Sequence, residues 1–410
     1  MRPPAEKRWR RIRNRRMEAM KSLWKVLAFS VILSMLIVSC VVPPLPAAQA
    51  PAPAAAEAVA PTAAPAPEPT AVPVVEPTAA PAPEPTAAPA QEDIPRGTLF
   101  SVKTDAAPVL DGMGDDAGWA NAPLSSFEVA KGANMGESVI NIQSLYTDDS
   151  VYFLLSWADP TESFVRSPWV KQADGTWMTL KDPDDKGGDN NVWYEDKMAF
   201  IWTINNSIPK FERTGCNTAC HLAKEGDTTG KPYGNKYTDE GTGDMWHWKS
   251  VRNLNQIDDQ YLDNTPWSAD APNAGRKSDP KDGGGYADNQ TEDKKLPMWM
   301  APDGGSKDGA PGFILDTEKV AFDDSLFVAG DMVPSIVTSE FTGDRGDLSA
   351  GWVYADGMWT LEIGRALVTG SEFDVQFDDL MMPYHFGMAV FDNAQVRHAF
   401  DSRPATLIFK

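Results

Sequence analysis

The fold class of this chain is decided by the stretch Val139-Ile-Asn-Ile-Gln-Ser-Leu-Tyr-Thr-Asp-Asp-Ser-Val-Tyr-Phe-Leu-Leu-Ser-Trp157. Apolar and polar residues alternate along both of its halves with the period of two that is typical of β-strands. The turn residues Thr147-Asp-Asp-Ser150 separate the two halves. The stretch therefore predicts a β-hairpin with strands at 139–146 and 151–157.

The same sequence pattern continues through the chain beyond Arg96, where short apolar and aromatic runs are separated by Asp, Gly, Pro and Asn. No helical apolar period is sustained for long. We therefore predict an all-β domain, mainly an antiparallel β-sandwich with long loops and short helices. A second hairpin turn is expected at Ala355-Asp-Gly357, and the further predicted strands are Lys197–Ile204, Gly351–Tyr354, Met358–Ile363, Phe373–Phe377, Phe386–Phe391 and Ala405–Phe409.

Residues 1–39 have the layout of a secretory signal, with clustered Lys and Arg followed by the apolar run Val26 to Val38. This run is too short for a membrane-spanning helix, which needs about 20 residues. It ends in Ile37-Val-Ser-Cys40, which resembles the bacterial lipoprotein box. The resemblance implies that Cys40 is lipidated and holds the protein at the extracytoplasmic face of a bacterial membrane. The alternative is an ordinary signal beside which Cys40 has no role.

Residues 40–95 consist largely of Pro, Ala, Thr and Glu, and one eleven-residue string occurs at 61–71 and again at 77–87. Such a composition predicts a disordered, extended stalk rather than a core. We expect one folded domain over 96–410. Within it, about 263–312 is a long loop insertion that either covers a site as a lid or lies on the surface.

The formal net charge of the chain is −21, and the acidic residues lie mainly after the basic signal segment. An acidic protein of this kind is a poor nucleic-acid ligand, so no nucleic-acid partner is predicted. The acidity favours either a basic protein partner or simple solubility.

The segment Gly215-Cys-Asn-Thr-Ala-Cys-His221 is the first candidate for chemistry. In c-type haem attachment, two cysteines bond the porphyrin and an adjacent histidine ligates iron, at the spacing Cys-x-x-Cys-His. Cys216 and Cys220 are one residue further apart, so that residue must loop out for the same geometry to hold. A Cys216–Cys220 disulfide explains the spacing equally well in an oxidising compartment.

Two further interpretations of this segment are weaker. A zinc site has suitable Cys and His ligands but no fourth partner in reach. A catalytic Cys–His pair is disfavoured because adjacent residues rarely present their side chains to each other.

A second candidate is Met245-Trp-His-Trp-Lys249. In a strand, Met245, His247 and Lys249 share one face and Trp246 and Trp248 share the other. Methionine sulfur and histidine nitrogen are ordinary haem ligands, and large flat indoles suit the wall of a porphyrin slot. The alternative is that the tryptophans are core residues and Lys249 extends its charged end to solvent.

Stretches over nearly the whole chain after the stalk carry a resemblance to a known family: Ser144–Thr161, Tyr194–Trp202, Gly215–His221, Met245–Arg252, Gly343–Asp347, Asp356–Glu362 and Phe386–His398. They resemble the haem-binding domain of cytochrome c-552-type proteins and of the γ subunits of ethylbenzene and dimethylsulfide dehydrogenases. Residues 110–119 also look like the start of a family 9-type carbohydrate-binding sandwich. The resemblance implies a β-sandwich that holds one haem and exchanges electrons with a molybdenum enzyme of the dimethylsulfoxide reductase type.

The ligands follow from the resemblance and the two segments together. His221 is the first expected iron ligand and Met245 the second, with Lys249, His247 and Met198 in reserve. The γ subunits hold a b-type haem through methionine and lysine. The haem here is c-type if Cys216 and Cys220 form thioethers, and otherwise b-type.

The leading functional hypothesis is thus an electron-transfer lipoprotein, not a stand-alone catalyst, because no nucleophile–base pair or acid pair stands out. The competing hypothesis is a lipoprotein that binds carbohydrate or another small ligand, with a structural disulfide. Trp119, Trp157 and Trp193 would then be platforms for sugar stacking.

Overall fold

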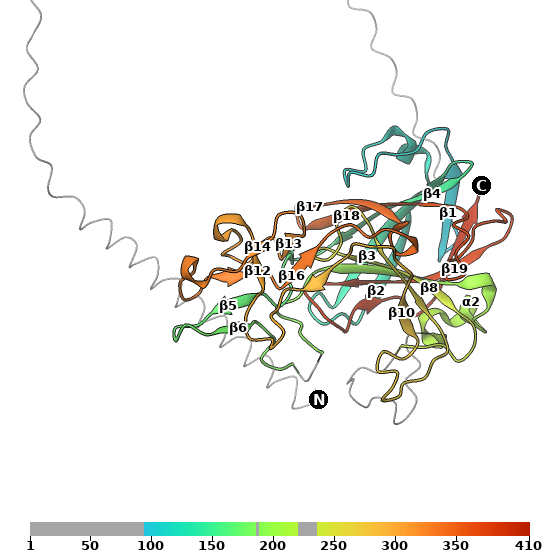
Figure 1. Cartoon of the computed structure of the whole chain (residues 1–410). Coiled ribbons are helices and arrows are strands. Elements are labelled where there is room, and N and C mark those ends of the chain that lie inside the picture. Colours follow the sequence, from blue (N-terminus) through green and yellow to red (C-terminus); the bar gives the residue numbers. More distant parts are fainter. Residues whose placement is uncertain (1–93, 186–187, 220–235) are drawn as a thin grey trace, which may run out of the picture. The chain divides into compact units, whose positions relative to one another are not determined.

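The computed structural model describes residues 94–185, 188–219 and 236–410 of the chain. The regular secondary structure of these residues is mainly strand, with short helical turns and a single α-helix among them, α2 (Phe211–Thr214) (Figure 1). The helical turns are η1 (Ala117–Asn121), η2 (Ile204–Asn206), η3 (Gly215–Thr218), η4 (Pro302–Gly304), η5 (Asp324–Leu326) and η6 (Asp344–Gly346).

The strands of the main sheet form two layers. The first layer runs in the order β2 (Ser125–Ala130), β3 (Glu137–Tyr146), β4 (Ser150–Ala158), β18 (Met358–Ala366) and β17 (Ser349–Ala355). The second runs β19 (Tyr384–Phe391), β7 (Lys197–Thr203), β8 (Gly243–Lys249), β9 (Asp258–Leu262) and β10 (Arg276–Ser278). Neighbours within each layer are antiparallel.

Two connections join the layers into one continuous sheet. Both lie along the edge of β19 that faces away from β7. Near the end of β19, β20 (Ala399–Phe400) pairs with β19 and with β2. Near the start of β19, β21 (Ala405–Phe409) pairs with β19 and with β1 (Thr98–Lys103), which in turn pairs with β3. The contacts of β1 with β21 and β3 are parallel, so the sandwich is mainly antiparallel, as predicted.

Aromatic side chains from both layers meet in the core. Trp157 of β4 contacts Trp248 of β8 with ring centroids 5.8 Å apart, and Phe153 of β4 contacts Trp202 of β7 at 6.0 Å. All four side chains are fully buried. Edge-to-face and tilted packing of this kind stabilises a core beyond the area that it buries.

Both predicted hairpins are present. β3 and β4 pair from Ile140–Trp157 to Tyr146–Val151, and β17 and β18 pair throughout around Asp356 and Gly357. The predicted strand Phe373–Phe377 is wrong, because this segment has no ladder partner. Its backbone groups bind elsewhere: Val375 N donates to Asp244 Oδ2, and Arg365 donates to the Val375 carbonyl.

The segment from Asp263 to Gly312 contains β10, β11 (Ala287–Asp288) and β12 (Trp299–Met300). β10 is the edge strand of the main sheet, whereas β11 and β12 belong to two of the three small sheets beside it. Their other strands are β5 (Trp169–Lys171), β6 (Trp177–Thr179), β13 (Phe313–Leu315), β14 (Val320–Ala321), β15 (Met332–Val333) and β16 (Ile336–Thr338). A second apolar cluster around Trp169 and Trp177 packs there.

Among the described residues, no helix has the length and apolar character to cross a membrane.

Candidate functional site

Strand β8 separates the two tryptophans of Met245–Lys249 from the other three side chains. Trp246 and Trp248 belong to the core between the two layers. Met245 belongs to a different cluster on the outer face, together with Cys216 and Phe211. The alternation expected for a strand is therefore present, and the tryptophans are core residues that do not face the outer surface of the sheet.

The turn η3 holds Cys216 against this outer face. Gly387 of β19 makes the close approach possible, because a Cβ on Gly387 would collide with Cys216 Sγ. Cys216 is buried, and its cluster includes Ile201 of β7 and Leu262 of β9. The first predicted segment and Met245 thus meet on one surface.

We expect Gly387→Ala to destabilise the domain by about 1–3 kcal/mol, since the added methyl overpacks this contact. Urea unfolding measures the loss. Exposed Gly305 lies outside the site, and Gly305→Ala is the control that should change stability little. If the two residues touch, the loss of stability in the double variant Gly387→Ala/Cys216→Ala should differ from the sum of the losses in the two single variants. A double variant whose loss equals that sum would contradict the contact.

His247 is a buried histidine with one nitrogen unused. Its Nδ1 lies 3.0 Å from Arg276 Nη2. A guanidinium can only donate, so Nδ1 accepts and Nε2 carries the ring proton. Nε2 is buried and has no hydrogen-bond partner among the described residues. Burial, and then the charges of Lys249 and Arg276, lower the pKa of His247 well below its usual value. The site therefore contains a neutral imidazole with a free N–H donor.

Lys249 is held in a buried salt bridge. Its Nζ donates to Asp258 Oδ2 of β9 and lies 3.4 Å from the Tyr286 hydroxyl. Arg345 donates to the other carboxylate oxygen of Asp258 at 2.6 Å. Tyr286 comes from the 263–312 segment, so this segment contacts Lys249 on the outer face.

Lys197 lies beside Lys249 on the neighbouring strand β7. Its Nζ donates to the Gln395 carbonyl at 3.0 Å and lies 4.0 Å from the Phe391 ring centroid. Burial, and then repulsion from Arg252, lower the pKa of Lys197 well below its usual value.

Glu195 anchors the same region from just before β7. Its carboxylate accepts from Arg252 Nε at 2.6 Å and from the Val251 and Arg252 backbone N–H groups at 3.0 and 3.1 Å. Burial alone raises the pKa of Glu195, but the charges of Arg252 and Arg166 outweigh it and hold that pKa below its usual value.

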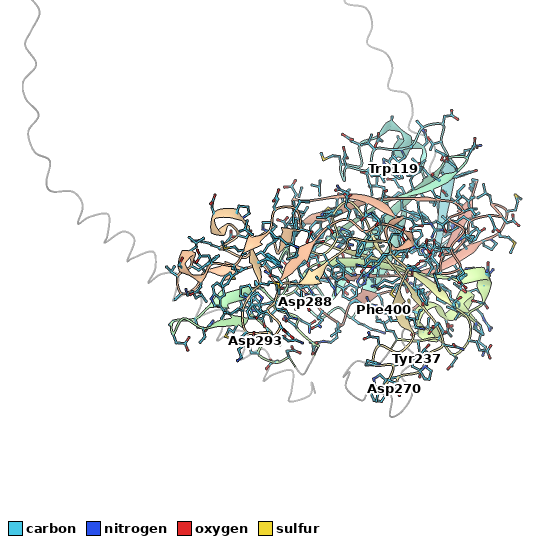
Figure 2. All side chains as sticks on the ribbon, in the orientation of Figure 1. Trp119, Tyr237, Asp270, Asp288, Asp293 and Phe400 are labelled. Atoms are coloured by element: carbon cyan, nitrogen blue, oxygen red, sulfur yellow. The ribbon has the colours of Figure 1, made fainter. Side chains whose placement is uncertain are left out.

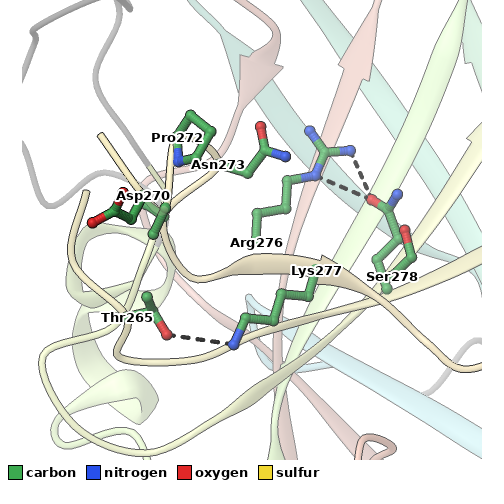
Figure 3. A pocket seen from close by; sticks show the side chains of 10 residues that line it. Thr265, Asp270, Pro272, Asn273, Arg276, Lys277 and Ser278 are labelled. Atoms are coloured by element: carbon green, nitrogen blue, oxygen red, sulfur yellow. Dashed lines mark hydrogen bonds between the residues drawn. The ribbon is translucent and has the colours of Figure 1, made fainter. Parts of the chain in front are cut away.

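A cavity of about 700 Å³ opens beside this face. It is lined by Gln260, the cross-strand partner of Met245, and by Arg276, which binds His247. Arg276 donates to Gln260 Oε1 from Nε at 3.2 Å and from Nη2 at 2.7 Å, and Figure 3 shows Lys277 close to Thr265. The volume lies in the range of small-molecule and cofactor sites.

The other predicted residues lie elsewhere. Met198 points from β7 into the core, on the opposite side of the sheet from Met245. Cys220, His221 and Cys40 lie outside the described residues. Their predicted roles, and the ligand set as a whole, stay predictions.

The sequence did not single out the other polar residues of the site, which are the charged Glu195, Lys197, Arg252, Asp258, Arg276 and Arg345 and the neutral Tyr286. For Lys197 there was a signal, because Glu195-Asp-Lys197 lies within a stretch that carries the family resemblance. Arg276 and Tyr286 come from the insertion, where no pattern marked them.

Two of the three proposed sugar platforms are core residues. Trp157 is 0% exposed and Trp119 is 3% exposed. Figure 2 labels Trp119, whose indole N–H donates to Glu362 Oε1 at 2.9 Å. Buried rings cannot stack on a sugar, so this part of the competing hypothesis is wrong.

Comparison with known proteins gives one family. The family described as ethylbenzene dehydrogenase matches residues 115–403. No curated protein matches the chain.

Solved structures show only remote likeness. The chain is similar to a family 9 carbohydrate binding module from Caldicellulosiruptor kristjanssonii in complex with cellotriose, at 9% identity over 76% of this chain and 93% of that one, with a TM-score of 0.27. It is also similar to a putative carbohydrate-binding protein from Bacteroides uniformis, at 9% identity over 77% and 99% of the two chains, with a TM-score of 0.32. At these values neither likeness carries an argument.

Proposed function

The chain belongs to the ethylbenzene dehydrogenase family, and from this premise we propose that it is a haem-binding electron carrier of the γ-subunit type, without substrate turnover of its own. The proposal rests chiefly on one observation. On the outer face of β8, Met245 and His247 are buried, and the His247 N–H has no acceptor among the described residues. Their partners Gln260 and Arg276 line a cavity of about 700 Å³.

The donor groups present suit a haem. Met245 supplies a soft sulfur ligand of the kind that haem iron accepts, and Cys216 lies in the same cluster. A haem also carries two carboxylates. Buried cations and N–H donors are what such groups need, and His247 Nε2 and the Arg276 guanidinium supply them.

Each residue then has a distinct task when a haem is bound. The haem supplies one-electron chemistry, while Met245 and His221 hold the iron. Cys216 and Cys220 either form thioethers, which makes the haem c-type, or leave it b-type. His247 would donate a hydrogen bond from Nε2 to a haem carboxylate. It would not bind iron through Nε2, because in the tautomer set by Arg276 this nitrogen carries the proton and has no lone pair to offer. Lys249 is less suited as a ligand than Met245, since it is already bound to Asp258.

The partner follows from the family. We propose that the protein passes electrons to or from a molybdenum enzyme of the dimethylsulfoxide reductase type. Lipidation at Cys40 would anchor it to the outer face of a bacterial membrane, and residues 40–95 would give it reach.

The test is an absorption spectrum of the full chain, expressed with a haem-maturation system. We expect a Soret band. Haem that stays with the chain after acid–acetone extraction establishes thioethers, and haem that extracts establishes b-type binding. Absence of any Soret band would end the proposal.

Two matched variants test the ligand. Met245→Leu removes the sulfur at nearly constant volume and should change the spin state and lower the reduction potential. Met198→Leu makes the same change on the core side of the neighbouring strand and should leave the spectrum as it was. The reverse result would assign the ligand to Met198 and move the haem to the other side of the sheet.

A further inference from the structure

Three buried carboxylates converge on the core side of the same sheet, away from the candidate haem surface. They belong to Asp259 of β9, Asp279 just after β10, and Asp374 in the loop before β19. One oxygen from each lies within 4.8 Å of the others. The side chains come from three separate parts of the chain, so tertiary folding brings them together.

Most oxygens of this cluster accept no hydrogen bond from the N–H and hydroxyl groups of the described residues. Asp279 is 3% exposed, and neither of its carboxylate oxygens accepts such a bond. The same holds for Asp259 Oδ2 and Asp374 Oδ1, which are also buried. The remaining oxygens accept ordinary bonds, Asp259 Oδ1 from the Gln260 N–H at 3.0 Å and Asp374 Oδ2 from Thr369 Oγ1 at 2.5 Å. Buried carboxylate oxygens without partners are costly, which points to a missing cation.

The surroundings add negative charge. Asp244 of β8 is fully buried and has an unpaired Oδ1, and Asp347 also has an unpaired Oδ1. Among the described residues, the cation paired with these carboxylates is Arg365, whose Nη1 lies 3.1 Å from Asp244 Oδ2 and 4.0 Å from Asp374 Oδ2. One guanidinium cannot neutralise all of these carboxylates. Burial, and then repulsion from Asp244 and Asp374, raise the pKa of Asp279 to about 9.

We propose that Asp259, Asp279 and Asp374 form a buried Ca²⁺ site, with Asp244 and Asp347 as further oxygen donors around it. Ca²⁺ takes six to eight oxygen ligands at about 2.3–2.6 Å, so two ligands of one ion lie up to about 5 Å apart. The observed spacing satisfies this limit.

The donor set selects the ion. Its oxygens suit a hard cation, and the absence of Cys and His from the cluster disfavours zinc and copper. Mg²⁺ usually keeps several waters, whereas a cage closed by protein groups is typical of Ca²⁺. The cluster's near-complete burial leaves little room for a hydrated ion.

A second acidic cluster differs from this one in its hydrogen bonding. Asp159, Asp196 and Asp392 also lie within 4.8 Å of one another. Asp196, however, accepts from the Ser163 and Asn393 N–H groups at 2.7 Å and from Trp359 Nε1 at 3.2 Å. Its carboxylate is already satisfied, so we do not extend the proposal to it.

The bound ion would tie β9, the end of β10 and the loop that holds Asp374 to one point. Asp259 and Trp246 are cross-strand partners, and Trp246 donates to Asp244 Oδ2 at 3.0 Å. Calcium would therefore stabilise the strands that carry Met245 from the opposite side of the sheet, and its binding does not depend on haem.

Terbium luminescence tests the site directly, because Trp246 lies close enough to sensitise a bound Tb³⁺. The full chain is stripped with EGTA and titrated with Tb³⁺ under excitation of tryptophan. We expect saturable emission that Ca²⁺ displaces, and a melting temperature several degrees higher with Ca²⁺ than with EGTA.

Asp279→Asn removes one charge at nearly constant shape and should weaken Ca²⁺ binding at least tenfold while abolishing its thermal effect. Asp378→Asn, an exposed position in the same loop, removes the same charge and should bind as the unchanged chain does. The circular dichroism of Asp279→Asn in EGTA shows that it folds. If it does not fold, Asp259→Asn takes its place. Equal Ca²⁺ affinity in the unchanged chain and the cluster variant, or no binding at millimolar Ca²⁺, would overturn the proposal.

Discussion

Glu195→Gln is expected to destabilise the domain by about 3–5 kcal/mol at neutral pH, because it leaves Arg252 as a buried charge without its partner. Glu195 is fully buried and accepts bonds from the side chain and backbone of Arg252. Urea unfolding of the two proteins at pH 7 measures the difference. A matched control is Glu128→Gln, since Glu128 forms an exposed salt bridge with Arg96, and there we expect a change below about 1 kcal/mol.

The same pair predicts a pH dependence. The pKa of Glu195 is lower in the folded chain than its usual 4.5. Its contribution is therefore fully present above about pH 4.5 and is lost as the pH falls through the folded value. The stability gap between Glu195→Gln and the unchanged chain should accordingly narrow below pH 4.5. A gap that stays constant down to pH 3 would show that the ion pair does not carry the effect.

Trp202→Ala is expected to cost about 3–5 kcal/mol, as large-to-small changes in a packed core do. The Trp202 ring packs against Phe386 at 4.5 Å, Trp246 at 5.2 Å and Phe377 at 5.4 Å, and its exposure is 0%. Thermal and urea unfolding measure the loss.

Trp202→Phe separates packing from polarity. The Trp202 indole N–H is buried and has no hydrogen-bond partner among the described residues. Phenylalanine removes the unpaired donor, which stabilises the fold, but it is smaller than tryptophan and leaves a small cavity, which destabilises it. Because the two effects oppose each other, the net change in the free energy of unfolding should be under about 1.5 kcal/mol. A loss as large as that of Trp202→Ala would mean that the indole N–H has a partner.

The strands that could be predicted are those whose pattern is local. The hairpin from Val139 to Trp157 carries its alternation and its turn within one continuous stretch, and both appear in the structure. Phe373–Phe377 has a similar apolar pattern, but its backbone groups form hydrogen bonds with the side chains of Asp244 and Arg365 instead of with a neighbouring strand. Local pattern cannot distinguish these cases, because one of the two partners, Asp244, is more than a hundred residues away in the sequence.

The candidate site was predictable only in part, for the same reason. Their residue types were sufficient to name Cys216 and Met245 as parts of one candidate site, and the structure places the two side chains in one cluster. The charges beside them were not predictable. Arg276 reaches His247 from the insertion, and the tautomer that follows from this contact changes His247 from a possible ligand into a donor.

By itself, then, the sequence determined the all-β class, the hairpins, the alternation along Met245–Lys249 and the family resemblance, because each depends on residue type and on spacing along the chain. Only the tertiary structure decided that Trp157 and Trp119 are core, that Met198 and Met245 lie on opposite sides of one sheet, and that Asp259, Asp279 and Asp374 share a buried cluster. Burial and charge pairing are properties of neighbours in space. These spatial neighbours come from strands that are distant in the sequence, and they meet only when the two layers of the sandwich pack together.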